Sequence, residues 1–279
     1  MTNPAPAAAK PGGKSLPPGG PTKDSMHLAE SSLIPGDAET IAAWKIAFFG
    51  AIAVLVILPI WRPSPFLEIM SFVPDGLIAT FTVTFASICI ALLLGLLAGL
   101  GRIARTTIIN RIATVYVEVV RGIPLLVHLF YIYYALGPLL HLNGFMSAIA
   151  ALSFCYGAYL AEIFRAGLQS IHKGQMEAAL ALGMSRTQAL WKIILPQTIR
   201  VILPPIGNEF IALLKDSSLV SILAVSDLLR RGREYASTTF FYLEAYTVVA
   251  LIYLIMTLFF SRLVGLMEER LRTHGRKNN

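Results

Sequence analysis

Charged residues are scarce in this sequence. Asp, Glu, Lys and Arg together make up 14% of its 279 residues, whereas 56% are hydrophobic, and the mean hydropathy is +0.67. Soluble globular proteins have about 25% charged and roughly 45–50% apolar residues. The composition therefore argues against a soluble enzyme of the cytosol and favours a chain that places apolar surface in lipid.

Cysteine is almost absent. Cys89 and Cys155 both lie in long apolar runs, where lone cysteines behave as small hydrophobic residues. The sequence therefore predicts neither a disulfide framework nor a metal site. It also carries no G-x-x-x-x-G-K-[ST] phosphate-binding loop. We therefore expect no enzyme activity, no ATPase site and no cofactor in this chain itself.

A signal peptide is missing as well. Residues 1–40 contain seven of the sixteen prolines and no apolar run of seven residues. Such a segment cannot bury enough apolar surface to offset the entropy lost on ordering. We expect a disordered tail over residues 1–40.

Six segments are long and apolar enough to cross a bilayer, which takes about 20 predominantly apolar residues. The fold class predicted is all-α, a polytopic membrane protein with six transmembrane helices. The fifth is the poorest, because we expect Pro204-Pro205 to break its backbone hydrogen bonds. The expected spans are residues 41–61, about 76–100, a stretch within 112–140, about 145–167, 199–214 and about 242–266.

Positive charge marks one side of the membrane. The net charge is +7, and most lysines and arginines fall in every second loop. In membrane proteins the loops that are rich in these residues are cytoplasmic. This pattern predicts that residues 102–111, residues 165–200 and both termini are cytoplasmic. Residues 230–233 disagree, because three arginines there would lie outside. The basic residues are scattered rather than gathered in a stripe, which gives a nucleic-acid role no support.

Small residues line one face of the second expected span. Ala91, Gly95 and Gly99 recur every four residues, and such small residues let helix backbones approach closely in lipid. The sequence leaves open whether this face packs within the chain or against a second chain.

The long loop between the fourth and fifth spans has the pattern of two short helices. Residues 175–182 are good helix formers, and Gly183 suits the left-handed position that follows a helix. Ser185 and Gln188 have the spacing of a capping box, which begins a second helix. Pro196 is expected to stop or kink that second helix. A cytoplasmic helix–turn–helix of this kind is a docking element for another protein.

The residues of this loop resemble a known motif. Glu177-Ala178-Ala179, Gly183, Ile193 and Leu195-Pro196 match the fixed positions of the EAA loop of ABC-importer permeases. The alternative is an ordinary amphipathic surface loop. The resemblance implies a coupling helix near Glu177 that sits in a cleft of an ATP-binding subunit. The ATPase-docking residues that it implies are Glu177, Ala178, Ala179, Leu182 and Gly183.

Other segments resemble the polar-amino-acid branch of these permeases. They are residues 117–126, 159–167 and 205–219, and the resemblance covers about residues 76–268, with a coupling loop at about 168–196. Residues 41–61 would be an additional helix and residues 269–279 a cytoplasmic tail. Ile123, His128 and Ser217 depart from the usual residues of the branch.

The resemblance implies an importer for polar amino acids in a bacterial inner membrane. Its partners would be two ATP-binding subunits that hold ATP and Mg²⁺, a second identical or homologous permease, and a periplasmic amino-acid-binding protein. Transport would proceed by alternating access. The alternative function is a six-helix secondary amino-acid transporter driven by an ion gradient.

Ionisable residues inside spanning segments are rare and are therefore candidates for function. Glu162 and Arg165, like Glu118 and Arg121, are three residues apart and are expected to pair along a helix face. Glu162 has two interpretations, a structural ion pair or a carboxylate that holds the amino group of the substrate. Broken helices mark transport paths, and residues 204–216 have either that role or the role of a hinge with interface charges. The candidate path residues are Glu162, Asn208, Glu209, Lys215, Asp216 and His128.

Two of these features have competing interpretations. His128 lies among aromatic residues, where a packed core histidine is the alternative to a path residue. Residues 227–235 are expected to form a helix on the outer face, either solvated or in contact with a binding protein.

Overall fold

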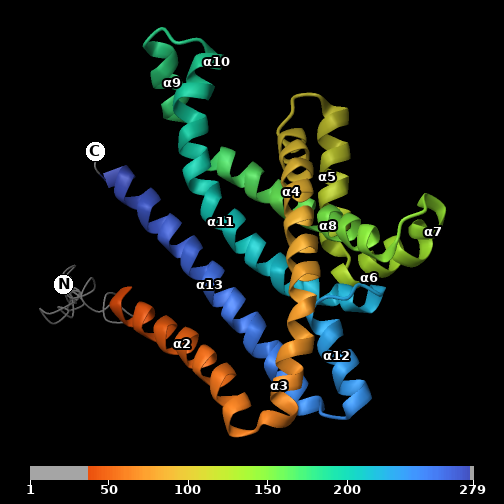
Figure 1. Ribbon diagram of the computed structural model, residues 1–279. Helices are drawn as coiled ribbons and strands as arrows, with labels where there is room; N and C mark the ends of the chain where they lie inside the picture. Colours follow the sequence, from red (N-terminus) through yellow and green to blue (C-terminus); the bar gives the residue numbers. More distant parts are fainter. Residues whose placement is uncertain (1–36, 277–279) are drawn as a thin grey trace, which may run out of the picture. The chain divides into compact units, whose positions relative to one another are not determined.

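The structure, a computed structural model, describes residues 37–276 (Figure 1). Most of the expected disordered tail, residues 1–36, lies outside the described residues, as do residues 277–279. The chain divides into two compact units, residues 1–46 and 47–279. The described part of the first unit is the beginning of helix α2 (Asp37–Trp61), and all other described elements belong to the second.

The described residues form helices and no strand. Five helical segments are long and apolar enough to cross a bilayer, and a bent pair makes a sixth span. The predicted class, an all-helical protein with six spans, is confirmed. Besides α2, the spans include α4 (Gly76–Arg102), α8 (Gly144–Ser170), α11 (Leu195–Asp216) and α13 (Tyr242–Arg276).

The third span, expected within residues 112–140, is present but is not one straight helix. Helix α5 (Thr107–Gly122) ends before Pro124, and the chain turns by 104° into the segment Leu125–Leu140. Ile123 has the extended angles φ −110° and ψ 134°. A residue before proline is driven out of the helical region, and proline has no N–H to continue the helix. The second arm consists of α6 (Leu125–Phe130), a π-helical turn and α7 (Gly137–Leu140).

Helix α11 is continuous, so the expected interruption of the helix at Pro204-Pro205 is wrong, although the two prolines do remove backbone hydrogen bonds. The two prolines leave the carbonyl groups of Arg200 and Val201 without their helical N–H donors. Neighbouring helices hold α11 in place, because it packs against both α8 and α13. Pro196 does not stop the preceding helix either. It lies in the first turn of α11, where a missing N–H costs little.

Helix α4 packs on α8 through its small residues. A Cβ atom added at Gly95 would lie 2.6 Å from the Cβ atom of Leu160, and one at Gly99 would lie 2.8 Å from the carbonyl oxygen of Ala161. Ala91 is fully buried. The small-residue face is therefore a contact within the chain, which resolves the alternative that the sequence left open.

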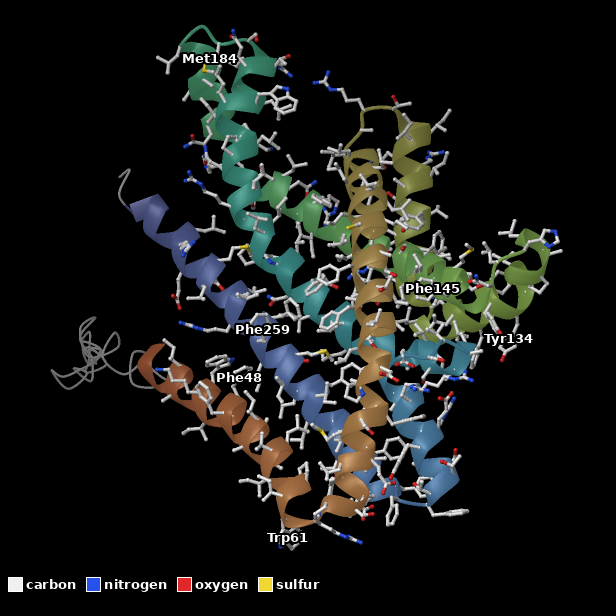
Figure 2. All side chains as sticks on the ribbon, in the orientation of Figure 1. Phe48, Trp61, Tyr134, Phe145, Met184 and Phe259 are labelled. Atoms are coloured by element: carbon white, nitrogen blue, oxygen red, sulfur yellow. The ribbon has the colours of Figure 1, made fainter. Side chains whose placement is uncertain are left out.

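Helices α3 (Pro63–Phe72) and α12 (Leu228–Thr239) pack with α13 in a second core at the end of the unit opposite the α4–α5 turn (Figure 1). The helix expected over residues 227–235 is α12, with Asp227 as its N-cap. Helix α3 was not expected. Figure 2 shows Trp61 at this end of the unit and Met184 at the opposite end.

The arginines that disagreed with the charge pattern have partners. Arg231 pairs with Asp75 at 3.0 Å and Arg230 pairs with Glu234 at 2.7 Å. Arg233 donates to a backbone carbonyl 3.1 Å away. Asp75 precedes α4 directly, at the end opposite Arg102. Two of the three positive charges at this end are thus paired with carboxylates within the chain.

Candidate functional site

Two short helices form the predicted docking loop (Figure 1). Helix α9 (Lys173–Ala181) ends in a turn closed by two backbone hydrogen bonds. Met184 N–H donates to Ala179 O at 3.1 Å, and Gly183 N–H donates to Leu180 O at 3.0 Å. Gly183 has φ +81°, the left-handed conformation that glycine adopts without strain. The predicted left-handed conformation of Gly183 is confirmed.

The second short helix, α10 (Arg186–Ala189), begins with the predicted capping box. Gln188 N–H donates to Ser185 Oγ at 3.2 Å, and Ser185 N–H donates to Gln188 Oε1 at 2.9 Å. The start of α9 was not predicted. There His172 Nδ1 accepts from Gly174 N–H at 3.1 Å. This cap could not be recognised from the residue type, because histidine is not a usual cap residue.

The loop presents an apolar side chain at its turn. Leu182 is 83% exposed, and Glu177, Ala178 and Gly183 are exposed beside it. Ala179 is 1% exposed, so it packs inside the loop rather than on its surface. Four of the five predicted docking residues are therefore available to a partner, and Ala179 supports them from within.

A network of ion pairs joins three helices near the α4–α5 turn. Arg102, at the end of α4, bonds Glu162 at 2.5 Å and Glu118 at 3.3 Å. Arg165 also bonds Glu162, as predicted. Glu118 therefore pairs with Arg102 rather than with Arg121. Arg102 was missed because its partners lie 16 and 60 residues away in sequence.

Glu162 has little capacity left for a substrate. Its two carboxylate oxygens are bonded by Arg165 and Arg102. The pairing favours the structural interpretation of this residue over a contact with an amino group.

A different group of polar side chains gathers where α5, α8 and α11 meet. Tyr156 Oη donates to Asp216 Oδ2 at 2.8 Å. The guanidinium of Arg121 lies 5.4 Å from the ring centroid of Tyr159. Glu209 lies two helical turns before Asp216 on α11, which places both carboxylates on one face of that helix. We call these five residues the central polar cluster.

The members of this cluster lie within electrostatic range of one another. The charges of Arg121 and Asp216 both act on Glu209, and the rings of Tyr156 and Tyr159 are 6.0 Å apart. The cluster thus offers carboxylates and a guanidinium across neighbouring helices. A zwitterion with separate positive and negative groups fits this arrangement.

The other candidate path residues lie elsewhere. Asn208 and Lys215 are exposed on α11. His128 is 8% exposed, and its Nδ1 atom lies 3.3 Å from the carbonyl oxygen of Pro124. It lines an apolar cavity rather than the central polar cluster. Among the described residues, no group of three or more His, Cys, Asp or Glu side chains is arranged to hold a metal ion.

Asp227 is a buried carboxylate between α11 and α12. It has no exposed surface and accepts from the N–H groups of Leu229 and Arg230 at 3.2 and 3.1 Å. Burial raises the pKa of Asp227 to about 6, although these two hydrogen bonds oppose the rise. The N–H of Leu228 donates to Thr80 Oγ1 at 3.1 Å, which ties α12 to α4.

Comparisons with known proteins agree with this arrangement. A family model described as binding-protein-dependent transport system inner membrane component matches residues 91–273. The chain is 38% identical over 217 residues to the glutamine transport system permease protein GlnP of Escherichia coli (strain K12), covering 76% of this chain and 96% of that protein. It is 40% identical over 194 residues to the probable amino-acid permease protein YxeN of Bacillus subtilis (strain 168), covering 68% and 87%.

Solved structures show the same architecture. The structure of an amino acid ABC transporter with histidines matches with a TM-score of 0.69 at 41% identity, over 73% of this chain and 96% of that one. An inward-facing structure of the MetNI methionine ABC transporter matches with a TM-score of 0.59 at 22% identity, over 72% and 98%. The second likeness concerns the fold alone.

Proposed function

The chain belongs to the family of inner membrane components of binding-protein-dependent transport systems, and we propose that it carries polar amino acids as the permease subunit of an ATP-binding-cassette importer. The relatives that cover most of its length are named for glutamine or amino-acid transport. The single observation that carries the proposal is the docking loop, whose closed turn presents Leu182. A secondary transporter driven by an ion gradient has no ATP-binding subunit to dock. The loop therefore favours the ATP-driven importer over that alternative.

The proposed assembly contains the partners that an ATP-driven importer needs. Two ATP-binding subunits hold ATP and Mg²⁺ and receive the docking loop, and a second permease chain completes the pore. A periplasmic binding protein delivers the amino acid to the face that carries α12. Both termini lie in the cytoplasm, on the side of the docking loop. Closure and reopening of the ATP-binding subunits drive alternating access of the permeases.

The central polar cluster is the proposed contact site for the amino acid. Arg121 attracts the α-carboxylate, while Glu209 and Asp216 attract the α-ammonium group. Charge-assisted hydrogen bonds of this kind are stronger than neutral ones. Tyr156 orients the carboxylate of Asp216 through its hydroxyl group.

Docking is tested by two substitutions at one position. Burying a leucine side chain contributes about 1.5–3 kcal/mol, so Leu182→Asp is expected to weaken association with the ATP-binding subunits by about ten- to a hundredfold. Leu182→Met is the matched control, because it keeps an apolar side chain of similar volume. Copurification of the ATP-binding subunits and ATP-driven uptake are measured. Wild-type values of both for Leu182→Asp would refute the docking assignment.

Substrate contact is tested with charge-neutral variants of the cluster. Asp216→Asn and Arg121→Gln should each lower the uptake of a neutral, zwitterionic amino acid. Glu118→Gln is the control, because Glu118 lies one turn from Arg121 on α5 but outside the cluster. If both cluster variants keep the wild-type KM and kcat, the proposed contact site is wrong, while the docking assignment stands.

A further inference from the structure

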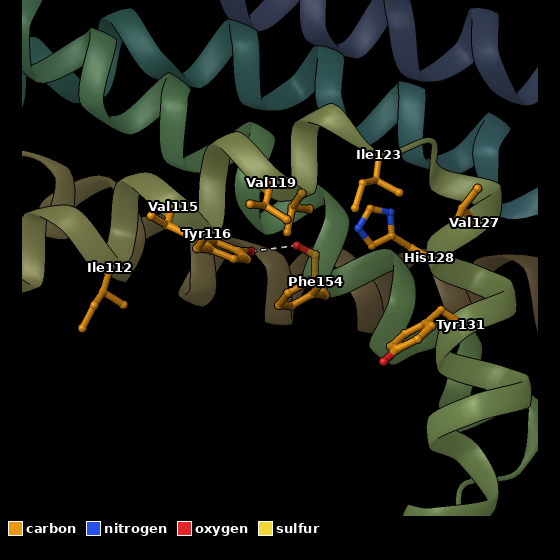
Figure 3. Close-up of a pocket in the computed structure, with 10 residues that line it drawn as sticks. Ile112, Val115, Tyr116, Val119, Ile123, Val127, His128, Tyr131 and Phe154 are labelled. Carbon is orange, nitrogen blue, oxygen red and sulfur yellow. Dashed lines mark hydrogen bonds between the residues drawn. The ribbon is translucent and has the colours of Figure 1, made fainter.

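An apolar groove runs along the exposed side of α5. It consists of adjoining cavities of about 570, 450 and 400 Å³. Phe154 lines all of them, Tyr116 lines the first two, and Leu94 lines the last two. We call these cavities together the lateral groove. Figure 3 shows its largest part, where the bend of the third span opens a space between α5, α6 and α8.

The walls of the lateral groove suit hydrocarbon and not a polar substrate. Tyr116 Oη donates to the carbonyl oxygen of Phe154 at 2.7 Å (Figure 3), so its hydroxyl group has a partner within the chain. Val115 and Val119 are 60% and 53% exposed. The groove is therefore open along α5 toward the surroundings of the helix bundle.

One end of the lateral groove reaches the turn between α4 and α5. Gly101 and Ile109 line that end. Arg105 lies in this turn, and Arg111 precedes the lining residue Ile112 in α5. Both are exposed, and neither forms an ion pair with any residue of the described part of the chain. Arg102, by contrast, is held by two glutamates.

Two hydrogen bonds stabilise the turn that carries Arg105 and leads into α5, where Arg111 lies. Asn110 Nδ2 donates to Arg102 O, and Ala104 N–H donates to Gly101 O at 3.1 Å. Helix α5 begins directly after the turn, and its N-cap Thr106 makes no side-chain hydrogen bond to the helix. The positive end of the α5 dipole thus adds to the charges of the arginines.

We propose that the lateral groove binds an anionic phospholipid. An acyl chain lies along the exposed face of α5, and the phosphate group is bonded by Arg105, Arg111 and the first N–H groups of α5. Apolar walls that lead to unpaired basic residues at the membrane surface match such a lipid in both of its parts. A second copy of this chain would bring the same unpaired arginines and would leave their charge uncompensated.

The test uses the complete transporter, purified from vesicles of phosphatidylcholine with or without phosphatidylglycerol. Native mass spectrometry measures the lipid that each complex retains. A basic residue near an anionic lipid contributes about fivefold in affinity, so Arg105→Gln/Arg111→Gln should retain phosphatidylglycerol about thirtyfold less well. Lys45→Gln/Arg200→Gln removes the same charge from exposed sites outside the groove and outside α9 and α10, and it should retain the lipid normally. Added inorganic phosphate should not displace the lipid, because the groove also holds the acyl chain.

A second variant addresses the groove separately from the arginines. Val115→Trp fills the groove at an exposed position, so folding should be preserved while lipid retention falls. Equal phosphatidylglycerol retention by the wild type and the double arginine variant would overturn the proposal, as would unchanged retention in Val115→Trp. Crosslinking of Val115→Cys between two permease chains, in a Cys89→Ala background, would also overturn it, because the groove would then be an interface between chains.

Discussion

The packing of α4 on α8 can be tested with the same substitution at two glycines. In Gly95→Ala the new Cβ atom would lie 2.6 Å from the Cβ atom of Leu160 and 3.0 Å from the carbonyl oxygen of Gly157. Neither atom is the far end of a flexible side chain, so the two helices must move apart. Overpacking of this kind costs about 1–3 kcal/mol.

Gly50→Ala provides the matched control in α2. A Cβ atom at Gly50 meets no other atom within 4 Å. Both substitutions gain up to about 1 kcal/mol from the better helix propensity of alanine. This gain cancels in the comparison, so we expect Gly50→Ala to be neutral or stabilising and Gly95→Ala to be less stable than it by about 1–3 kcal/mol.

The assay is thermal unfolding of the purified chain in detergent, followed by circular dichroism at one fixed heating rate, because such unfolding is rarely reversible. The expected difference corresponds to a midpoint about 2–12 °C lower for Gly95→Ala than for Gly50→Ala. Gly99→Ala repeats the test one turn further along α4, where the clash is with a backbone carbonyl oxygen. Equal midpoints for the variants at Gly50 and Gly95 would refute the inferred contact between α4 and α8.

Three further predictions concern single residues. The pKa of Asp227 in the folded chain, about 6, lies above its ordinary value of 3.8, so the folded state binds the extra proton and gains stability as the pH falls from about 6 to 4, by up to about 3 kcal/mol. Asp227→Asn should lose this dependence of the melting temperature on pH while keeping a helix cap. Gly183→Ala places a side chain in a left-handed conformation at a cost of about 1–2 kcal/mol, so it should reduce uptake more than Gly183→Asn does, and equal uptake would contradict this. Arg102→Gln should destabilise the chain by about 2 kcal/mol, because it removes a charged hydrogen bond to Glu162, whereas Arg102→Lys should lose less in the same melting assay.

Composition and hydropathy were sufficient for the fold class, because lipid imposes a length on each apolar helix. They did not reveal how proline acts in each place. Pro124 ends a helix and turns the third span by 104°, whereas Pro204 and Pro205 lie inside a continuous helix. Proline removes the same N–H group in all three cases. Only the packing of the surrounding helices decides whether the chain bends, and a single sequence does not contain that information.

The docking loop was predictable because its signals are local. Gly183 and the pair Ser185 and Gln188 act over a few residues, and each was found where the spacing placed it. The membrane site was less predictable because its contacts are distant in sequence. Tyr156 and Asp216 are 60 residues apart, and no pattern in either segment points to the other.

Helix α11 connects the two sites directly. Its 22 residues span about 33 Å at 1.5 Å per residue, from the end of the docking loop to Asp216 in the central polar cluster. Two hydrogen bonds are missing near its middle, at Pro204 and Pro205, so resistance to bending is lowest there. In the proposed importer, a displacement of α9 and α10 would reach the cluster through the π-helical turn Leu190–Ile194 and then α11. We expect such a motion to act on the pairing of Tyr156 with Asp216 at the far end of α11.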